Sequence, residues 1–459
     1  MRSKRAKAMF AFAGMMLAQS SGVAFALGED TRALLDTLVK KGLITNQEAA
    51  EIATRARKDS AEDDGDRIRM KSWIEDLTLF GDARTRYEFR EGQSGFAPGS
   101  SGGPSSGTQG DTFARERFRY RLRFGALAKF TDDFMMGLRL ETSANNRSTN
   151  VTFGDDGGPF GKGSDGIFIG QAYANWAPAD WATLVVGKMP NPLMTSSMVW
   201  DPDLNPEGAA EKIRFMVNDR VVVFAAFGQF LYDEARVNNP LGKGGIRKNL
   251  FMFANQIGAE FELGKDVSLA AAPTVYVYAG SGDRFAAATT PNFTGDDTTG
   301  AALDRLLVVE IPLELKWRMF DQPWKIFADF AVNADGKARA HLARDFAGDR
   351  ETYAYQIGVV VGSTAKKGDW EAKVFRQRTG LYALDPNLVD ADLFDSRLNM
   401  EGFALSLGYA FTDFLSGTIT YARADRIEKN LLTSAPGDLT GLNPLNDYQL
   451  LQLDLNFRF

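Results

Sequence analysis

The last thirteen residues, 447–459, read DYQLLQLDLNFRF and decide the fold class. One face of this stretch takes Leu451, Leu453, Leu455, Phe457 and Phe459, and the other takes Leu450, Gln452, Asp454, Asn456 and Arg458. A period of two predicts a β-strand whose faces meet different surroundings. Because no following segment is there to cover the apolar face, we expect lipid to cover it. A half-buried strand of a soluble sandwich is the alternative.

The composition of the 459-residue chain excludes several classes of site. Cysteine is absent and His341 is the single histidine, so disulfide frameworks, thiolate nucleophiles and multi-histidine metal sites are excluded. No cofactor is expected. Beyond the N-terminus no apolar run approaches the roughly 18 residues that a membrane helix needs. If the protein lies in a membrane, it must therefore do so as a β-barrel.

Residues 1–26 have the pattern of a cleaved secretory signal peptide. Arg2, Lys4, Arg5 and Lys7 precede an apolar run, which leads to the small-residue site Ala24-Phe25-Ala26. The alternative is an N-terminal membrane anchor. Removing these four positive charges takes the formal net charge from −6 to −10. Export predicts a Gram-negative envelope protein located in the outer membrane.

Residues 27–72 predict a short periplasmic helical hairpin followed by a charged linker. The helical period runs from Glu29 to about Ser60, stops at Gly42 and restarts at a capping box of Thr45 and Glu48. Isolated helices of this length are marginal in water, so we expect contact with a partner copy, the barrel mouth or the cell wall. A solvated spacer is the alternative.

Residues 73–459 repeat one unit, a pair of alternating strands joined by a connection. We expect sixteen strands, one of them running without interruption over residues 267–279. Very short connections, such as residues 131–133 and 178–180, alternate with long Gly- and Asp-rich ones, and aromatics such as Trp176 and Trp181 flank the short ones. This pattern is typical of a transmembrane barrel with an interfacial aromatic girdle. The sequence therefore predicts an all-β fold, a transmembrane antiparallel β-barrel of about 16 strands with a short α-helical N-terminal segment.

Several segments resemble a porin family of Gram-negative outer membranes, the Putative porin family. They are LLDTLVKKGLITNQEAA at residues 34–50, Pro190-Asn191-Pro192 with the following WDPDLNPEG at 200–208, YQIG at 355–358, KKGDWEA at 366–372 and LGYA at 407–410. The resemblance implies contact with outer-membrane lipid and lipopolysaccharide, and recognition of the C-terminal strand by the barrel assembly machinery. It also implies a homo-oligomer, a trimer by analogy with general porins.

The first two strands of the barrel concentrate arginine on one face. A charge on the lipid face near the bilayer midplane costs roughly 2 to 4 kcal/mol, so we expect these side chains to face the lumen. One interpretation is an electrostatic lattice that holds the wall together. The other is a rail for anions, since rows of charge set pore selectivity. The predicted basic wall comprises Arg84, Arg86, Arg117, Arg119, Arg121 and Arg123, extended by Arg139 of the third strand.

The connection at residues 189–209 follows the fifth expected strand, the position at which general porins fold a loop into the lumen. Its prolines stiffen it, and Asp201, Asp203 and Glu207 make it acidic. An acidic constriction loop opposite a basic wall would create a transverse field. The alternative is an external loop with solvated carboxylates.

The resulting hypothesis is a passive diffusion channel for small hydrophilic solutes, with an anion preference suggested by the arginines. The alternatives are a porin selective for phosphate, other oxyanions or carbohydrate, and a structural or adhesive barrel without an open pore. No reaction is expected, because His341 lies in a loop-like stretch, residues 338–344, with no catalytic partner in view. Nothing points to nucleic acid.

Deleting residues 29–60 should leave a barrel that inserts and conducts, because no strand is expected there. Insertion into planar bilayers and single-channel recording would test this. A truncated protein that fails to insert would show that the segment is part of the barrel fold.

Overall fold

The computed structural model describes residues 73–95, 112–143, 147–155, 166–233, 249–279, 306–342, 346–434, 438–439, 442 and 444–459. The expected signal peptide and helical hairpin lie outside the described residues. In this part of the chain no helix is long and apolar enough to cross a membrane.

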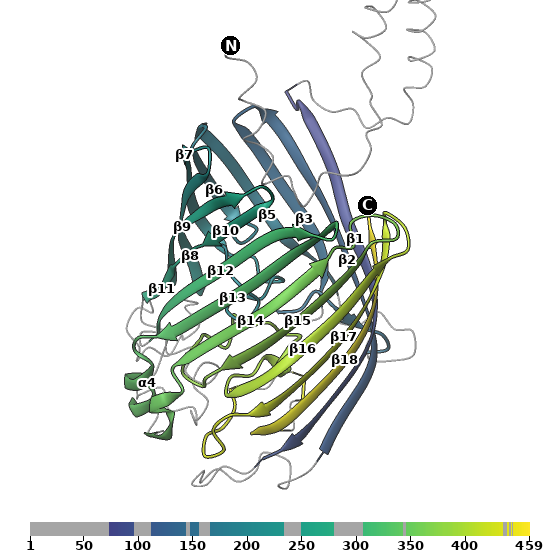
Figure 1. The fold of residues 1–459 in the computed structure, drawn as a ribbon, viewed down its shortest axis with the longest axis vertical. Coiled ribbons are helices and arrows are strands. Elements are labelled where there is room, and N and C mark those ends of the chain that lie inside the picture. Colours follow the sequence, from purple (N-terminus) through teal and green to yellow (C-terminus); the bar gives the residue numbers. More distant parts are fainter. Residues whose placement is uncertain are drawn as a thin grey trace, which may run out of the picture. The chain divides into compact units, whose positions relative to one another are not determined.

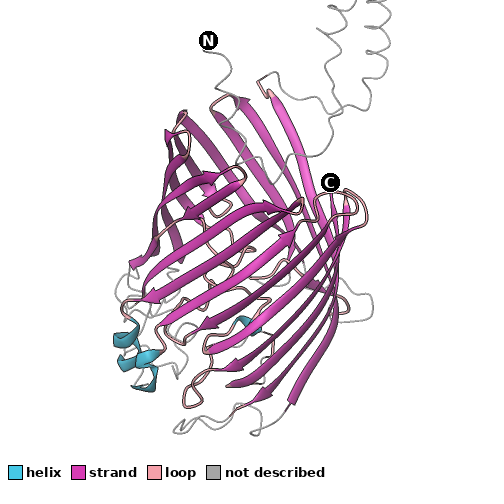
Figure 2. Ribbon diagram, in the orientation of Figure 1, coloured by secondary structure: helices cyan, strands magenta, loops and turns pink. Residues whose placement is uncertain are grey.

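One antiparallel sheet contains every described strand (Figures 1 and 2). The first half of the chain supplies β1 (Asp76–Ser94), β2 (Thr112–Thr131), β3 (Phe134–Ser143), β4 (Val151–Thr152), β5 (Gly166–Ala179), β6 (Ala182–Lys188), β7 (Glu207–Asn218), β8 (Val221–Asp233) and β9 (Leu250–Gly264). The second half supplies β10 (Val267–Ala271), β11 (Thr274–Ala279), β12 (Leu307–Met319), β13 (Gln322–Asn333), β14 (Tyr353–Gly362), β15 (Trp370–Thr379), β16 (Met400–Ala410), β17 (Leu415–Arg426) and β18 (Leu445–Arg458).

These eighteen segments occupy sixteen strand positions around the barrel, here called staves, as the sequence predicted. The two-residue β4 pairs with β2 beyond the end of β3, so β3 and β4 share one stave. The strand expected over 267–279 is divided into β10 and β11, which both pair with β9 and β12. The division falls at Pro273, which has no N–H to donate to a ladder.

The sheet closes on itself through β1. This strand pairs with β2 along one edge and with β18 along the other, so the first and last strands are neighbours. Closure leaves no sheet edge, which is the condition for placing strands in hydrocarbon. The predicted all-β antiparallel barrel is therefore confirmed.

The two faces of the sheet differ as the alternation predicted. On β18, Leu453 and Leu455 are 42% and 37% exposed, whereas Gln452, which precedes Leu453, is 4% exposed. Exposed Phe118 and Leu122 of β2 likewise alternate with buried Arg117 and Arg119. An apolar outer face of this extent is unusual for a protein in water, and it is the surface that lipid would cover.

Exposed aromatics lie at the short turns. Trp176 and Trp181 flank the β5–β6 turn, and Phe411 and Phe414 flank the β16–β17 turn, all about half exposed. Their position fits the expected interfacial girdle.

The sequence predicted that His341 lies in a loop-like stretch with no catalytic partner in view, and both points were wrong. It lies in a short helix, α4 (Gly336–Leu342), rather than a loop, and its Nε2 lies 2.7 Å from Asp349 Oδ1 in the 3-10 helix η5 (Phe346–Arg350). Its side chain is 44% exposed.

Ile419→Arg should impair barrel assembly, whereas Thr418→Arg on the same strand should be tolerated. Ile419 is 52% exposed on the outer face, and an arginine there costs about 2 to 4 kcal/mol near the midplane. Thr418 pairs with Asp454 of β18 on the inner face, where an added guanidinium meets a carboxylate. The readout is the fraction of protein whose electrophoretic mobility shifts on heating in detergent. Equal assembly of the two variants would contradict the assignment of faces.

Candidate functional site

The register of β1 and β2 places arginines opposite one another on the inner face. Arg84 pairs with Arg121, Arg86 with Arg119, and Arg90 with Arg115, while Glu88 lies opposite Arg117. Like charges directly across an antiparallel pair are destabilising, so this face needs carboxylates from elsewhere. We call this set, with Arg123, the arginine wall: Arg84, Arg86, Arg90, Arg115, Arg117, Arg119, Arg121 and Arg123.

Arg86 is held by two carboxylates from distant parts of the chain. Its Nε and Nη2 donate to Asp454 of β18 at 2.6 and 2.8 Å, a bidentate pair. Its Nη1 donates to Asp392 at 2.7 Å. Closure of the barrel brings Asp454 to this position, because β18 pairs Asp454 directly with Arg86.

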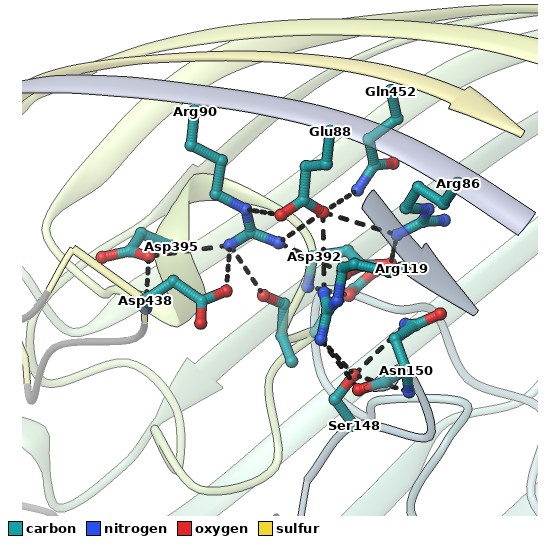
Figure 3. Close-up of polar contacts among 12 residues, drawn as sticks. Arg86, Glu88, Arg90, Arg119, Ser148, Asn150, Asp392, Asp395, Asp438 and Gln452 are labelled. Carbon is teal, nitrogen blue, oxygen red and sulfur yellow. Dashed lines mark hydrogen bonds and ion pairs between the residues drawn. The ribbon is translucent and has the colours of Figure 1, made fainter. Parts of the chain in front are cut away.

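Glu88 is the centre of the network (Figure 3) and is fully buried. It accepts hydrogen bonds from Arg90 Nε at 2.8 Å, Arg117 Nε at 2.6 Å and Gln452 Nε2 at 2.9 Å. Arg90 also lies 3.1 Å from Asp438 and 3.3 Å from Asp392. A buried carboxylate with this many charge-assisted donors is satisfied, and removing any donor would leave charge uncompensated.

The end of the wall at Arg121 and Arg123 is partly open. Arg121 and Arg123 share Asp82, at 2.7 and 2.6 Å, and Arg123 is 22% exposed. Arg139 of β3 pairs with Glu141 on its own strand at 2.8 Å. The predicted wall thus lies on one inner face with most of its charge paired.

Arg84 and Arg119 have the weakest compensation. Both turn to Asn150, whose side-chain oxygen accepts from Arg84 at 2.5 Å and whose carbonyl accepts from Arg119 at 3.1 Å. Their closest carboxylates are 3.8 and 3.6 Å away, and within the described residues neither Nε has a hydrogen-bond partner. Neutral oxygens therefore replace carboxylates at this point of the wall.

The connection between β6 and β7, residues 189–206, folds into the barrel interior. Met189, Met198 and Trp200 are buried. The Trp200 indole packs near Phe230 and Tyr276 and donates to the Leu204 carbonyl at 2.9 Å.

The three acidic residues expected on this loop have different surroundings. Asp201 is buried and accepts from the backbone N–H groups of Asp203 and Ala391, both at 2.9 Å. Asp203 lies 3.8 Å from Arg123, so it reaches the arginine wall. Glu207 is the first residue of β7 and lies 3.1 Å from Lys188, away from the other two.

The segment between β15 and β16, residues 380–399, is a component that sequence reasoning missed. Leu381, Tyr382, Phe394 and Arg397 within it are buried. Backbone bonds join it to the loop at 189–206: Asp201 N donates to Leu388 O at 2.6 Å, and Asp390 N donates to Ser197 O at 3.1 Å. Its apolar composition, LYALDPNLVDADLF, was the available signal, because an external loop has little use for so many large apolar residues.

Comparison with known proteins gives the family. The family model described as Putative porin matches residues 60–301, more than half of the chain. The chain belongs to this porin family. It is therefore an outer-membrane barrel of the porin type.

Solved porin structures resemble this porin at low identity. A high-pH structure of Pseudomonas putida OprB has a TM-score of 0.47 and 11% identity, covering 83% of this chain and 94% of that chain. Salmonella typhi OmpF in complex with daunomycin has a TM-score of 0.43 and 10% identity, with coverages of 85% and 100%. A triple mutant of Rhodopseudomonas blastica porin has a TM-score of 0.38 and 11% identity, with coverages of 84% and 100%. No curated protein matches the chain.

Carboxyl groups inside the porin differ in pKa according to their neighbours. Burial, together with repulsion from Asp390 and Asp203, raises the pKa of Asp201 to about 8. Burial also tends to raise the pKa of Asp392, but Arg86 and Arg90 outweigh it and hold the pKa below its usual value. Asp392 is therefore the ionised partner of the wall, and Asp201 lies in a less favourable environment for charge.

Asp201→Asn should weaken the pH dependence of thermal stability. A carboxyl whose pKa rises from 3.8 to about 8 on folding binds a proton more tightly in the folded state, so stability falls as pH rises between these values. Asparagine is neutral throughout, and any lost hydrogen bond should cost a similar amount at both pH values.

The measurement is the midpoint temperature of the detergent mobility shift at pH 5 and pH 9. Asp133→Asn is the control, because Asp133 lies in the β2–β3 turn with a lowered pKa and is ionised at both pH values. A midpoint that falls between pH 5 and pH 9 as much in Asp201→Asn as in the wild type would refute the linkage.

Proposed function

We propose that this porin is a passive diffusion channel for small hydrophilic solutes. The observation that carries the proposal is the closed sixteen-stave barrel with an apolar outer face and a charged inner face. A barrel of this strand number is wide enough to hold an aqueous channel. Single-channel conductance in planar bilayers tests it, and a protein without ion steps would favour the structural or adhesive barrel instead.

The proposed charge selectivity is a modest anion preference. Asp82, Glu88, Asp392, Asp438 and Asp454 neutralise much of the arginine wall. The excess positive charge lies at Arg84 and Arg119, which face Asn150, and at Arg121 and Arg123, which share one carboxylate. Selectivity for phosphate, another oxyanion or carbohydrate remains the alternative within the channel class, to be separated by a panel of salts and sugars.

Catalysis is not part of the proposed function. Porin families are typically channels rather than enzymes. His341 and Asp349 lie together on α4 and η5, and their side chains are 44% and 30% exposed.

The proposed partners and processing follow the sequence. Residues 1–26 would be cleaved on export, and the C-terminal strand would be recognised during barrel assembly. The barrel would contact lipid and lipopolysaccharide and form a trimer, and residues 27–72 would contact the cell wall. The division into residues 1–26, 27–72 and 73–459 is likewise a proposal.

Arg121→Gln together with Arg123→Gln should lower the anion-to-cation permeability ratio about twofold or more in dilute salt, where charges act over about 10 Å. Asp203→Asn should raise the ratio, because Asp203 lies beside the same arginines. The reversal potential in a salt gradient gives the ratio, and the shifts should shrink near 1 M salt, where screening shortens to about 3 Å.

The matched control is Arg376→Gln with Arg423→Gln, which removes the same charge from exposed positions on the outer face. If both double variants shift the reversal potential equally, the effect comes from overall charge and not from the wall. If neither the inner double variant nor Asp203→Asn shifts it, the arginines are scaffolding.

A further inference from the structure

We propose that residues 385–392, here called the strap, form a second constriction element that sets the size limit of the channel. This inference rests on the proposed channel function. The strap is part of the buried segment 380–399 and is anchored at both ends and near its middle to other parts of the barrel interior.

The first anchor is Asp385, which is 4% exposed. Its Oδ2 accepts hydrogen bonds from the hydroxyl groups of Tyr232 at 2.7 Å and Tyr278 at 2.9 Å. These tyrosines belong to β8 and β11, and their rings meet edge to face. The anchor therefore fixes one end of the strap to the part of the wall formed by β8, β9 and β11.

The last anchor is Asp392, which lies on the arginine wall. It accepts from Arg86 at 2.7 Å and lies 3.3 Å from Arg90, both on β1 (Figure 3). Its carbonyl accepts from the Tyr448 hydroxyl at 3.4 Å. This end is therefore fixed to the wall formed by β1 and β18.

These two walls lie on opposite sides of the barrel. In the closed order of staves β1 is the first and β10–β11 is the ninth of sixteen, so β11 and β1 are half a circuit apart. Eight extended residues reach at most about 26 to 29 Å. The strap therefore crosses the lumen from one wall to the other.

The middle of the strap is joined to the loop at 189–206. Asp201 of the loop contacts the strap twice. Its backbone N–H donates to Leu388 O, and its carboxylate accepts a hydrogen bond from Ala391 N–H. Asp390 N donates to Ser197 O. Loop and strap thus form one partition, and a solute has to pass beside it.

The strap is a specificity-determining element distinct from the acidic loop. The loop contributes Asp203 to the open end of the wall, whereas the strap occupies the cross-section itself. Removing an anchor should therefore change the size of the solutes that pass, whereas changing Asp203 should change the charge of the ions that pass.

The experiment removes the first anchor without altering the strap. In Tyr232→Phe with Tyr278→Phe, Asp385 loses both hydroxyl donors and keeps the two Asn387 donors and the nearby Arg339 charge. Because hydrogen bonds to a charged group are the stronger kind, we expect the anchored state to be disfavoured by about tenfold or more. We expect single-channel conductance to rise about twofold as the partition opens. Liposome swelling should show larger neutral sugars entering.

The matched control is Tyr87→Phe with Tyr355→Phe. Each of these hydroxyls also bonds to a carboxylate, Glu116 and Glu401, but on the outer face of the barrel. This pair should keep the wild-type conductance and size limit. A control that widens the channel equally would overturn the proposal.

The absence of cysteine from the chain allows a second measurement. Ser197→Cys with Asp390→Cys places thiols on two residues whose backbones are hydrogen bonded at 3.1 Å. Added to the Tyr232→Phe, Tyr278→Phe background, the oxidised disulfide should restore the wild-type size limit, and reduction should widen it again. The two tyrosine hydroxyls remain absent throughout, so rescue would come from the position of the strap alone.

The outcomes are distinguishable. If the wild type conducts and the Tyr232→Phe, Tyr278→Phe variant has the same conductance and size limit, the strap is not a constriction. If the channel widens but the disulfide does not restore it, another element sets the limit. A wild type that does not conduct would remove the proposed function itself.

Discussion

Pairing between β1 and β18 is the contact on which the rest of the structure depends. Its ladder runs from Asp82 opposite Arg458 to Ser94 opposite Leu445 and joins the two ends of the sheet. Without it, both strands would present unpaired N–H and C=O groups that hydrocarbon cannot satisfy. The same register fixes the chemistry of the interior, because it places Asp454 beside Arg86 and Gln452 beside Glu88.

Closure also explains why the arginine wall takes its carboxylates from remote segments. Within the part of β1 and β2 that carries the eight arginines, the inner face offers them Asp82 and Glu88. The remaining compensation comes from β18 through Asp454 and from interior segments through Asp392 and Asp438. Charge balance thus couples the barrel wall to the segments that fill it, and Glu88 links both groups through Arg90 and Arg117.

The local sequence pattern was sufficient to predict the barrel strands, but it was not sufficient to predict the segments and contacts that fill the barrel interior. The sixteen staves and the inward face of β1, β2 and β18 could be predicted because alternation and turns are properties of adjacent residues. The Asp392 contacts could not, because Arg86 and Arg90 lie 306 and 302 positions away. Glu207 illustrates the intermediate case: a boundary shift of a few residues moves it from the expected loop to the start of β7. Besides the apolar composition of the segment 380–399, Pro273 carried a local signal that was overlooked, since it marks the division between β10 and β11.

The interior is asymmetric, and this asymmetry follows from the width of the barrel. Sixteen strands enclose more space than inward side chains can fill, so chain segments occupy part of it. Met198 and Trp200 of the loop at 189–206 pack with Tyr276 of β11 and Tyr382 of the segment 380–399 in one apolar cluster. The arginine wall lies half a circuit away from β11. Its groups are polar, and Arg115 and Arg123 within it are 33% and 22% exposed. A hydrated solute would have to disrupt packing to cross the apolar side. Under the proposed function, the path therefore runs along the arginine wall, where Arg123 and Asp203 are partly exposed.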